Sequence, residues 1–237
     1  MTVKPAPIRG EVPPDYRGPV YYRARIDSYE GFKRGVHEFI KFEQKGLGQD
    51  LASADPIQAA HRVAPQLFDE KGELLPKWTV PLKARAASDA PKNWPEWASG
   101  SYTVVSQRVR DAIEEFEPGK HVFIPIDVAN KDGSARRVYA FYQISSETRP
   151  SLALAANGIE HSLGPSGDPL FEKPEWLKSD RFAYLNSQVV RDSAVDFDPR
   201  TGLVLSGELV EKLGDVFPKG LVLVPMGLAD EKIGGRG

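Results

Sequence analysis

The sequence contains no cysteine. This absence excludes disulfide bonds, thiolate catalysis, zinc–thiolate sites and iron–sulfur clusters, and it agrees with a reducing compartment. Long apolar runs are also missing, because no stretch approaches the roughly 20 residues of a membrane span. The N-terminal stretch MTVKPAPIRGEVPPDYRG lacks the apolar core of a signal peptide. We therefore expect a cytoplasmic protein that has no membrane partner.

A large excess of charge of either sign is missing as well. The 237 residues carry a formal net charge of −2, which argues against a nucleic-acid binder that works through a broad basic face. The length is sufficient for one large domain or two small ones with a real hydrophobic core.

Recognisable catalytic motifs are scarce. There is no G-x-S-x-G elbow and no phosphate-binding G-x-x-x-x-G-K loop. None of the four histidines pairs with another His, Asp or Glu at i,i+3 or i,i+4 on a good helix, as a metal site on a helix would show, so we expect no metal site and no cofactor. The best enzyme-like cluster is His161 with Asp168, in a loop rich in glycine and proline, and a plain surface loop is the simpler interpretation.

One stretch of the sequence occurs twice. The segment VVSQRVRDAIEEFEPGKHVFIPI (Val104 to Ile126) is followed one hundred residues later, without a gap, by VLSGELVEKLGDVFPKGLVLVPM (Val204 to Met226). Serines, prolines and apolar positions coincide, as Ser106 with Ser206 and Pro125 with Pro225 show. Two copies at a fixed offset indicate an internal duplication.

Each copy predicts a strand, a short helix and a second strand, over about residues 102–126 and 203–226. The serine after the first strand suits a helix N-cap, and apolar residues then recur at helical spacing. Pro and Gly end the helix. The apolar runs Val122–Ile126 and Leu221–Pro225 are typical of strands that are covered on both faces.

The remaining segments add strands. Alternating side chains in Pro19–Asp27 and Val36–Glu43 predict an N-terminal β-hairpin. The Asp132-Gly133 turn and the strand Arg137–Ser145 predict a second hairpin. Leu67–Trp94 is poorly periodic and indicates irregular structure. These elements predict an α/β protein of the mixed α+β kind, with mixed sheets.

No low-complexity linker divides the chain, so we expect a single domain over residues 1–237. Within it, an N-terminal subregion (1–94) would precede the duplicated region (95–228), and residues 229–237 would form a flexible tail.

Aromatic and acidic side chains offer weak signals for a binding surface. Four tryptophans lie in proline-rich segments, where they usually pin loops to the core but can serve as exposed anchors for a partner: Trp78, Trp94, Trp97 and Trp176. Carboxylates cluster at 114–117 and at 192–198. A solvated surface is the simpler interpretation of these clusters, and an acidic patch for a basic partner is the alternative.

The duplicated pattern resembles that of Imm11-type immunity proteins. In this family a strand leads into "vvSe-r-l-rdlLee", followed by "v-f-Pv-v" and a "Yy-ln" strand, with a second "vSeelke-l---gl-GlvF-Pv" near the C-terminus. Matching residues in this sequence include Val105-Ser106, Phe123, Pro125 and, in the second copy, Ser206 and Pro225. The resemblance covers roughly Trp97 to Leu228, and the first ninety residues match only in general character.

The resemblance implies a protein that binds and neutralises a cognate bacterial toxin in the cytoplasm, without catalysis, cofactor or nucleic acid. As partner contacts we expect the irregular stretch with Trp78, Trp94 and Trp97, and the loop with His161, Asp168 and Trp176. Two alternatives remain: an enzyme of unknown reaction class that uses His161 and Asp168, and a self-associating scaffold.

Overall fold

The computed structural model covers the 237-residue chain. The residues that it describes are 6–26, 39–53, 67–71, 73–88, 90, 94, 96–98, 102–144, 152–160, 162–163, 169–170, 179–191, 193–198, 202–214 and 221–230. The chain forms two compact units. The first unit comprises residues 1–5, 28–144 and 215–220, and the second comprises 6–27, 145–214 and 221–237.

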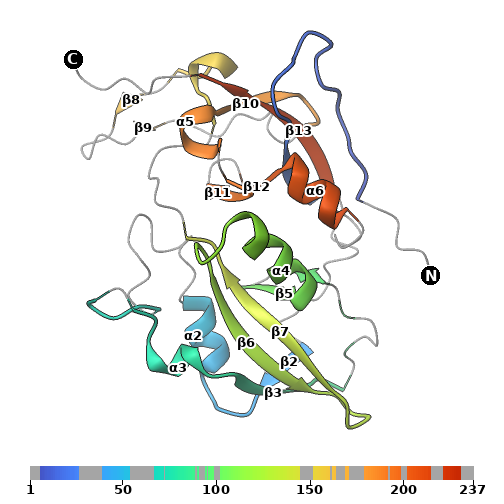
Figure 1. Ribbon diagram of the computed structural model, residues 1–237, viewed down its shortest axis with the longest axis vertical. Helices are drawn as coiled ribbons and strands as arrows, with labels where there is room; N and C mark the ends of the chain where they lie inside the picture. Colours follow the sequence, from blue (N-terminus) through green and yellow to red (C-terminus); the bar gives the residue numbers. More distant parts are fainter. Residues whose placement is uncertain are drawn as a thin grey trace. The chain divides into compact units, whose positions relative to one another are not determined.

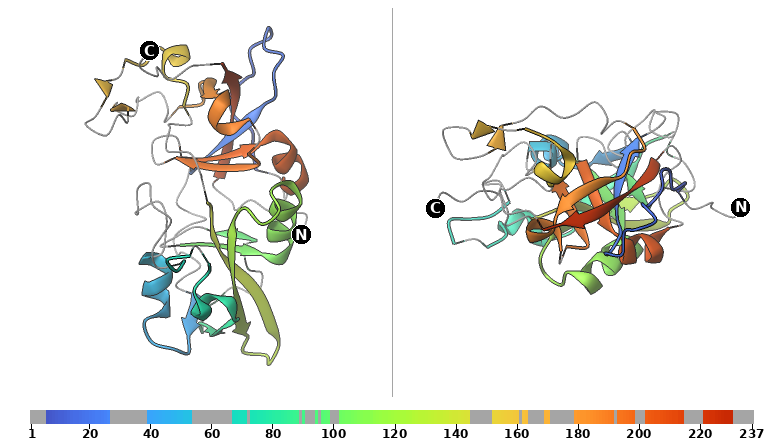
Figure 2. Two further views of the ribbon diagram at one scale, coloured as in Figure 1. Left: turned by 60° about the vertical axis from the view of Figure 1, so that its left-hand side comes forward. Right: turned by 90° about the horizontal axis from the view of Figure 1, so that it is seen from above.

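The first unit contains a mixed six-stranded sheet with the order β2-β3-β6-β7-β5-β4 (Figure 1). Its strands are β2 (Ile40–Phe42), β3 (Leu82–Ala86), β4 (Trp97–Ala98), β5 (Thr103–Ser106), β6 (Val122–Ala129) and β7 (Ala135–Tyr142). Its helices are α2 (Leu47–Ser53), α3 (Pro76–Thr79) and α4 (Gln107–Phe116). The β6–β7 hairpin is a long, twisted ribbon in the views of Figures 1 and 2.

The second unit contains a mixed five-stranded sheet with the order β10-β13-β1-β12-β11. Its strands are β1 (Tyr21–Ile26), β10 (Ala183–Asn186), β11 (Val195–Asp198), β12 (Gly202–Ser206) and β13 (Leu221–Ala229). The remaining elements are the 3₁₀ turn η2 (Ala155–Asn157), the helices α5 (Ser187–Val190) and α6 (Gly207–Leu213), and the small pair β8 (Ser162–Leu163) and β9 (Pro169–Leu170). The expected mixed α+β fold is confirmed.

Both copies of the repeated segment form the expected strand–helix–strand unit. In each, the serine that ends the first strand caps the helix: Ser106 Oγ accepts from Val109 N at 3.3 Å, and Ser206 Oγ accepts from Leu209 N at 3.2 Å. The cap satisfies an amide that the first helical turn leaves without a partner. The α4 and α6 helices bury the predicted apolar stripe, which includes Ile113 and Leu213.

The two sheets have the same topology around their helices. In each, the two strands of the copy run parallel with one antiparallel strand between them: β7 separates β5 from β6, and β1 separates β12 from β13. The register also agrees, since Tyr139 lies opposite Val105 and Pro125 while Tyr22 lies opposite Leu205 and Pro225. The inserted strand follows the copy in the first unit and precedes it in the second.

The outer strands continue this correspondence. The strand β3 pairs in parallel with β6 as β10 pairs with β13. On the opposite edge, β4 pairs with β5 as β11 pairs with β12. Two equivalent backbone bonds support the match, from Ser106 N to Glu96 O and from Ser206 N to Ala194 O, both 2.8 Å.

Three expectations about local structure are wrong. The expected N-terminal hairpin does not form, because β1 pairs with β12 and β13 while β2 pairs with β3 in the other sheet. The stretch 67–94, expected to be irregular, contains α3 and β3. The run Val122–Ile126 is not covered on both faces, since Phe123 and Pro125 are half-exposed.

The packing groups the chain differently from the expected subregions 1–94 and 95–228. The first copy shares a unit with residues 39–98, whereas the second copy is joined by residues 6–26. The expected tail from residue 231 onward lies outside the described residues; Ala229 ends β13 and Asp230 follows it.

Candidate functional site

The first sheet has one fully covered side and one partly covered side. Alternate residues of β6 (Ile124, Ile126 and Val128) belong to the main core, where Leu51 of α2 and Trp78 of α3 pack with them. Because side chains alternate along a strand, the residues between them point to the other side of the sheet. There α4 packs against β5 and β7, and Figures 1 and 2 show α4 on one side of the β6–β7 ribbon with α2 and α3 on the other.

Beyond α4, the partly covered side reaches solvent over β2, β3, β6 and the start of β7. We call this area the open face. It consists of Lys41, Glu43, Lys83, Arg85, Phe123, Pro125, Asp127 and Arg137. The side chains of Lys83 and Arg85 are 63% and 76% exposed, whereas their neighbours Leu82 and Ala84 are buried in the core. Successive side chains of β3 thus point alternately into the core and onto the open face.

A row of charges crosses the open face. Asp127 lies opposite Lys83 of β3 and Arg137 of β7 in the register of the sheet. Its carboxylate accepts hydrogen bonds from Arg137 Nε at 2.7 Å and Lys83 Nζ at 2.8 Å. These two bonds lower the pKa of Asp127 to about 2. Asp127 is therefore an anion under all ordinary conditions.

Cations outnumber anions on this face. Next to the row, Lys41 lies opposite Arg85, and Arg85 Nε is 3.5 Å from Glu43 Oε1. The four cations Lys41, Lys83, Arg85 and Arg137 and the two anions Glu43 and Asp127 give the open face a net charge of +2, on a chain whose formal net charge is −2. This face can attract an acidic partner.

An aromatic strip borders the charged row. Phe123 stacks on Phe141 with ring centroids 5.1 Å apart, and the Tyr139 ring stands at 87° to the Phe123 ring with centroids 6.5 Å apart. Arg110 of α4 lies 5.1 Å from the centre of the Tyr139 ring. Half-exposed Phe123 and Pro125 thus form an apolar border on a rigid sheet.

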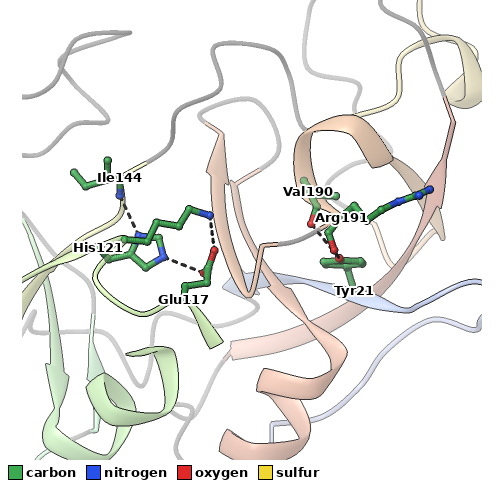
Figure 3. Close-up of polar contacts among 7 residues, drawn as sticks. Tyr21, Glu117, His121, Ile144, Val190 and Arg191 are labelled. Carbon is green, nitrogen blue, oxygen red and sulfur yellow. Dashed lines mark hydrogen bonds and ion pairs between the residues drawn. The ribbon is translucent and has the colours of Figure 1, made fainter. Parts of the chain in front are cut away.

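A buried polar cluster supports the end of this strip. His121 Nε2 donates to Glu117 Oε2 at 2.9 Å, while His121 Nδ1 accepts from Ile144 N at 3.2 Å (Figure 3). Burial alone would raise the pKa of Glu117, but the hydrogen bonds from His121 and Lys120 outweigh it and lower that pKa. The edge of His121 packs on Phe141, with centroids 5.6 Å apart.

Sequence reasoning missed this cluster. We expected no histidine to pair with an acid at helical spacing, yet Glu117 and His121 are four residues apart and pair across the Pro118-Gly119 turn. The E-x-x-x-H spacing was the available signal. The side chain of His121 is completely buried, so the pair orients the start of β6 and is closed to a substrate.

The predicted partner contacts fall into two groups. Trp78 is completely buried, and Trp94 and Trp97 are 9% and 4% exposed. These three tryptophans hold the core: Trp97 packs on Phe141 at 5.8 Å, and Trp94 lies beneath Arg136 at 5.8 Å. His161, Asp168 and Trp176 lie outside the described residues.

The acidic cluster at 114–117 has one buried member, Glu117, which pairs with His121. Glu114 is half-buried and accepts from Gly119 N at 3.2 Å, and Glu115 is exposed. The bonds of Glu114 and Glu117 close the end of α4. Among the residues that the structure describes, no group of three or more His, Cys, Asp or Glu side chains could hold a metal ion, and no described helix has the length and apolar character needed to cross a membrane.

The second unit provides a comparison for the open face. Gly227 takes the register position of Asp127, and Tyr184 takes that of Lys83. There the N-terminal arm, residues 6–20, covers the sheet: Tyr16 packs on Phe182 at 5.4 Å and near Tyr184 at 6.3 Å. Tyr16 OH also accepts from Leu228 N at 2.7 Å. Figures 1 and 2 show the arm running beside β13.

Comparison with protein families gives a match to part of the chain. Residues 40–147 match the model of a family described as Immunity protein family (Imm11). The matched region begins with β2 and includes the whole first sheet, so it takes in residues 40–96, which the sequence resemblance left out. The second copy, for which we also expected a match, lies outside it. A search of curated proteins finds no match.

Proposed function

We propose that this protein, which belongs to the Imm11 immunity family through residues 40–147, binds a cognate bacterial toxin and thereby neutralises it in the cytoplasm of the producing cell. Membership of this family implies toxin neutralisation. The family match is the observation that carries the proposal. The toxin itself has to be identified by experiment.

The geometry supports a binding role for the matched region. All residues of the open face lie between positions 40 and 147. They stand on paired strands of one sheet, and rigid strands hold a binding surface in place without the cost of ordering a loop. A face with mixed charges and an aromatic border resembles the polar rim and anchor side chains of protein interfaces.

The proposed mode of action is inhibition by binding, without catalysis by this chain. The one acid–histidine pair among the described residues, Glu117 with His121, is sealed in the core. Both nitrogens of the imidazole are already engaged in structural hydrogen bonds, one to Glu117 and one from Ile144 N. Such a pair contributes rigidity.

The test is neutralisation by co-expression. The C-terminal domain encoded by the neighbouring open reading frame is expressed inducibly, and survival is scored with this protein, with an empty vector and with an unrelated immunity protein. Rescue by this protein alone, together with a stable copurified complex, supports the proposal. A toxic neighbour that this protein neither binds nor silences contradicts that pairing.

A further inference from the structure

We propose that the open face binds an extended, acidic segment of the toxin, placed across β3 and β6 as the N-terminal arm is placed across β10 and β13 in the second unit. This inference rests on the proposed function and specifies its binding site and the chemistry of the partner. It is carried by the correspondence of the two sheets and by the charge of the open face.

The arm shows what this sheet topology accommodates beside its helix. Residues 7–9 pair in parallel with the edge of β13 through an Ile8–Leu223 bridge, in which Leu223 N donates to Pro7 O at 3.0 Å and Arg9 N donates to Leu223 O at 2.9 Å. The chain then reaches Tyr16, whose ring covers Gly227 so closely that an added Cβ would lie 2.7 Å from it. An extended segment with one aromatic anchor therefore seals this half of the second sheet.

The corresponding half of the first sheet is only partly covered. Leu223 of β13 is 1% exposed, and Pro225 is also buried. Their equivalents in β6 include half-exposed Phe123 and Pro125. One copy of the topology thus carries its cover within the same chain. In the other copy the same surface remains available to a second chain.

Charge decides the chemistry of the segment. The position of Gly227 is held in the first sheet by Asp127, whose negative charge is already compensated by Arg137 and Lys83. Glu43 pairs with Arg85, so the excess positive charge comes from Lys41 and from the second cation beside Asp127, and Lys41 and Arg85 are both exposed. An aspartate- or glutamate-rich segment complements this excess, because opposite charges steer association and favour the correct partner.

The aromatic border sets the direction of the contact. Phe123 and Pro125 lie towards the start of β6, and the cations lie along β2, β3 and the start of β7. An apolar side chain of the toxin segment would pack on Phe123, while the acidic residues follow across Lys83 and Lys41. The neighbouring Phe141 and buried His121 hold Phe123 in place.

The experiment reverses charge on the open face. The double variant Lys41→Glu/Arg85→Glu is tested in the full chain against the toxin domain from the neighbouring gene. The matched control, Lys71→Glu/Lys212→Glu, makes the same change in net charge at exposed residues outside the first sheet. Affinity is measured by titration at low and at physiological salt, and folding is checked by the melting temperature.

The proposal predicts that the open-face variant melts like the wild type but binds at least about tenfold more weakly, mainly through slower association, with a smaller difference at high salt. The control binds within about twofold of the wild type. Equal affinity of the open-face variant and the control overturns the inference while leaving the proposed function intact. If the wild type does not bind at all, the proposed function fails first.

Two other occupants of the face are distinguished by the same proteins. If a 30-nucleotide RNA binds the wild type and not the open-face variant, while toxin affinity is equal for both, the face serves nucleic acid and the inference is wrong. If light scattering shows a wild-type dimer that the open-face variant dissociates, a second copy occupies the face and the inference is likewise wrong. A monomer that ignores RNA and loses toxin affinity on charge reversal supports it.

Discussion

Asp127 and Gly227 occupy the same register position in the two sheets, opposite Lys83 and Tyr184 respectively. One is a carboxylate held by two cations at the surface, and the other lies beneath the ring of Tyr16. The same topology therefore has a polar, open surface in one unit and a covered surface in the other. This difference yields predictions for stability and for binding.

Replacing Asp127 by asparagine should lower the free energy of unfolding by about 0.5–1 kcal/mol at neutral pH, because surface ion pairs contribute little. The folded-state pKa of about 2 lies below the ordinary 3.8. The carboxylate therefore stabilises the fold above pH 4, and this stabilisation is lost as the pH falls towards 2. Melting curves of both proteins between pH 2 and 7 should converge at the acidic end. A constant difference across that range would contradict the assignment.

Replacing His121 by alanine should cost about 3 kcal/mol, since it leaves a buried carboxylate and a cavity. Glu117→Gln should cost about 1 kcal/mol, because the amide oxygen still accepts from His121 Nε2. Urea denaturation of both variants tests the difference. Equal losses would show that an amide cannot replace the Glu117 carboxylate as the partner of His121.

Replacing Gly227 by alanine should destabilise the second unit by about 2 kcal/mol, because the new methyl group meets the rings of Tyr16 and Phe182 at 2.7 and 2.8 Å. In a Tyr16→Ala background the same change should cost less, since one of the two rings is gone. A double-mutant cycle measures this coupling. Strict additivity would mean that Tyr16 does not cover Gly227 in solution.

Replacing Ser106 or Ser206 by alanine should cost about 1 kcal/mol in each case, the usual effect of losing an N-cap. The loss should be larger for Ser106, whose hydroxyl also donates to Glu96 at 3.1 Å. Chemical denaturation ranks the two variants, with Glu211→Ala as a control at an exposed position of α6. A harmless Ser106→Ala would indicate that water replaces the cap.

Replacing Trp78 by alanine should remove about 4 kcal/mol of stability, because the ring is completely buried in the first core. Any loss of protection in this variant should follow its loss of folded protein. Comparing soluble yield and melting temperature with toxin survival checks this. A variant that stays folded and fails to protect would instead support the prediction that Trp78 contacts the partner.

The local pattern determined the two strand–helix–strand copies and their caps. These elements depend on interactions within a few residues, so they can be predicted from the sequence. The signals are the apolar spacing, the serines at 106 and 206, and the Pro and Gly residues that end the helices. The Asp132-Gly133 hairpin is equally local, and the family resemblance followed from the same residues. The E-x-x-x-H pair could also have been found in the sequence, but we considered only pairs that lie on a helix.

Only the tertiary structure decided which partners these elements take. The expected pairing of β1 with β2 failed because β1 is the antiparallel strand between β12 and β13, nearly two hundred residues away. Alternation along a strand shows which side of the strand is apolar, but it does not show which distant strand pairs with it. The open face depends on the same long-range pairing. The apolar run of β13 is buried because the arm covers it. The similar run of β6 stays half-exposed, because no segment of the described first unit covers it.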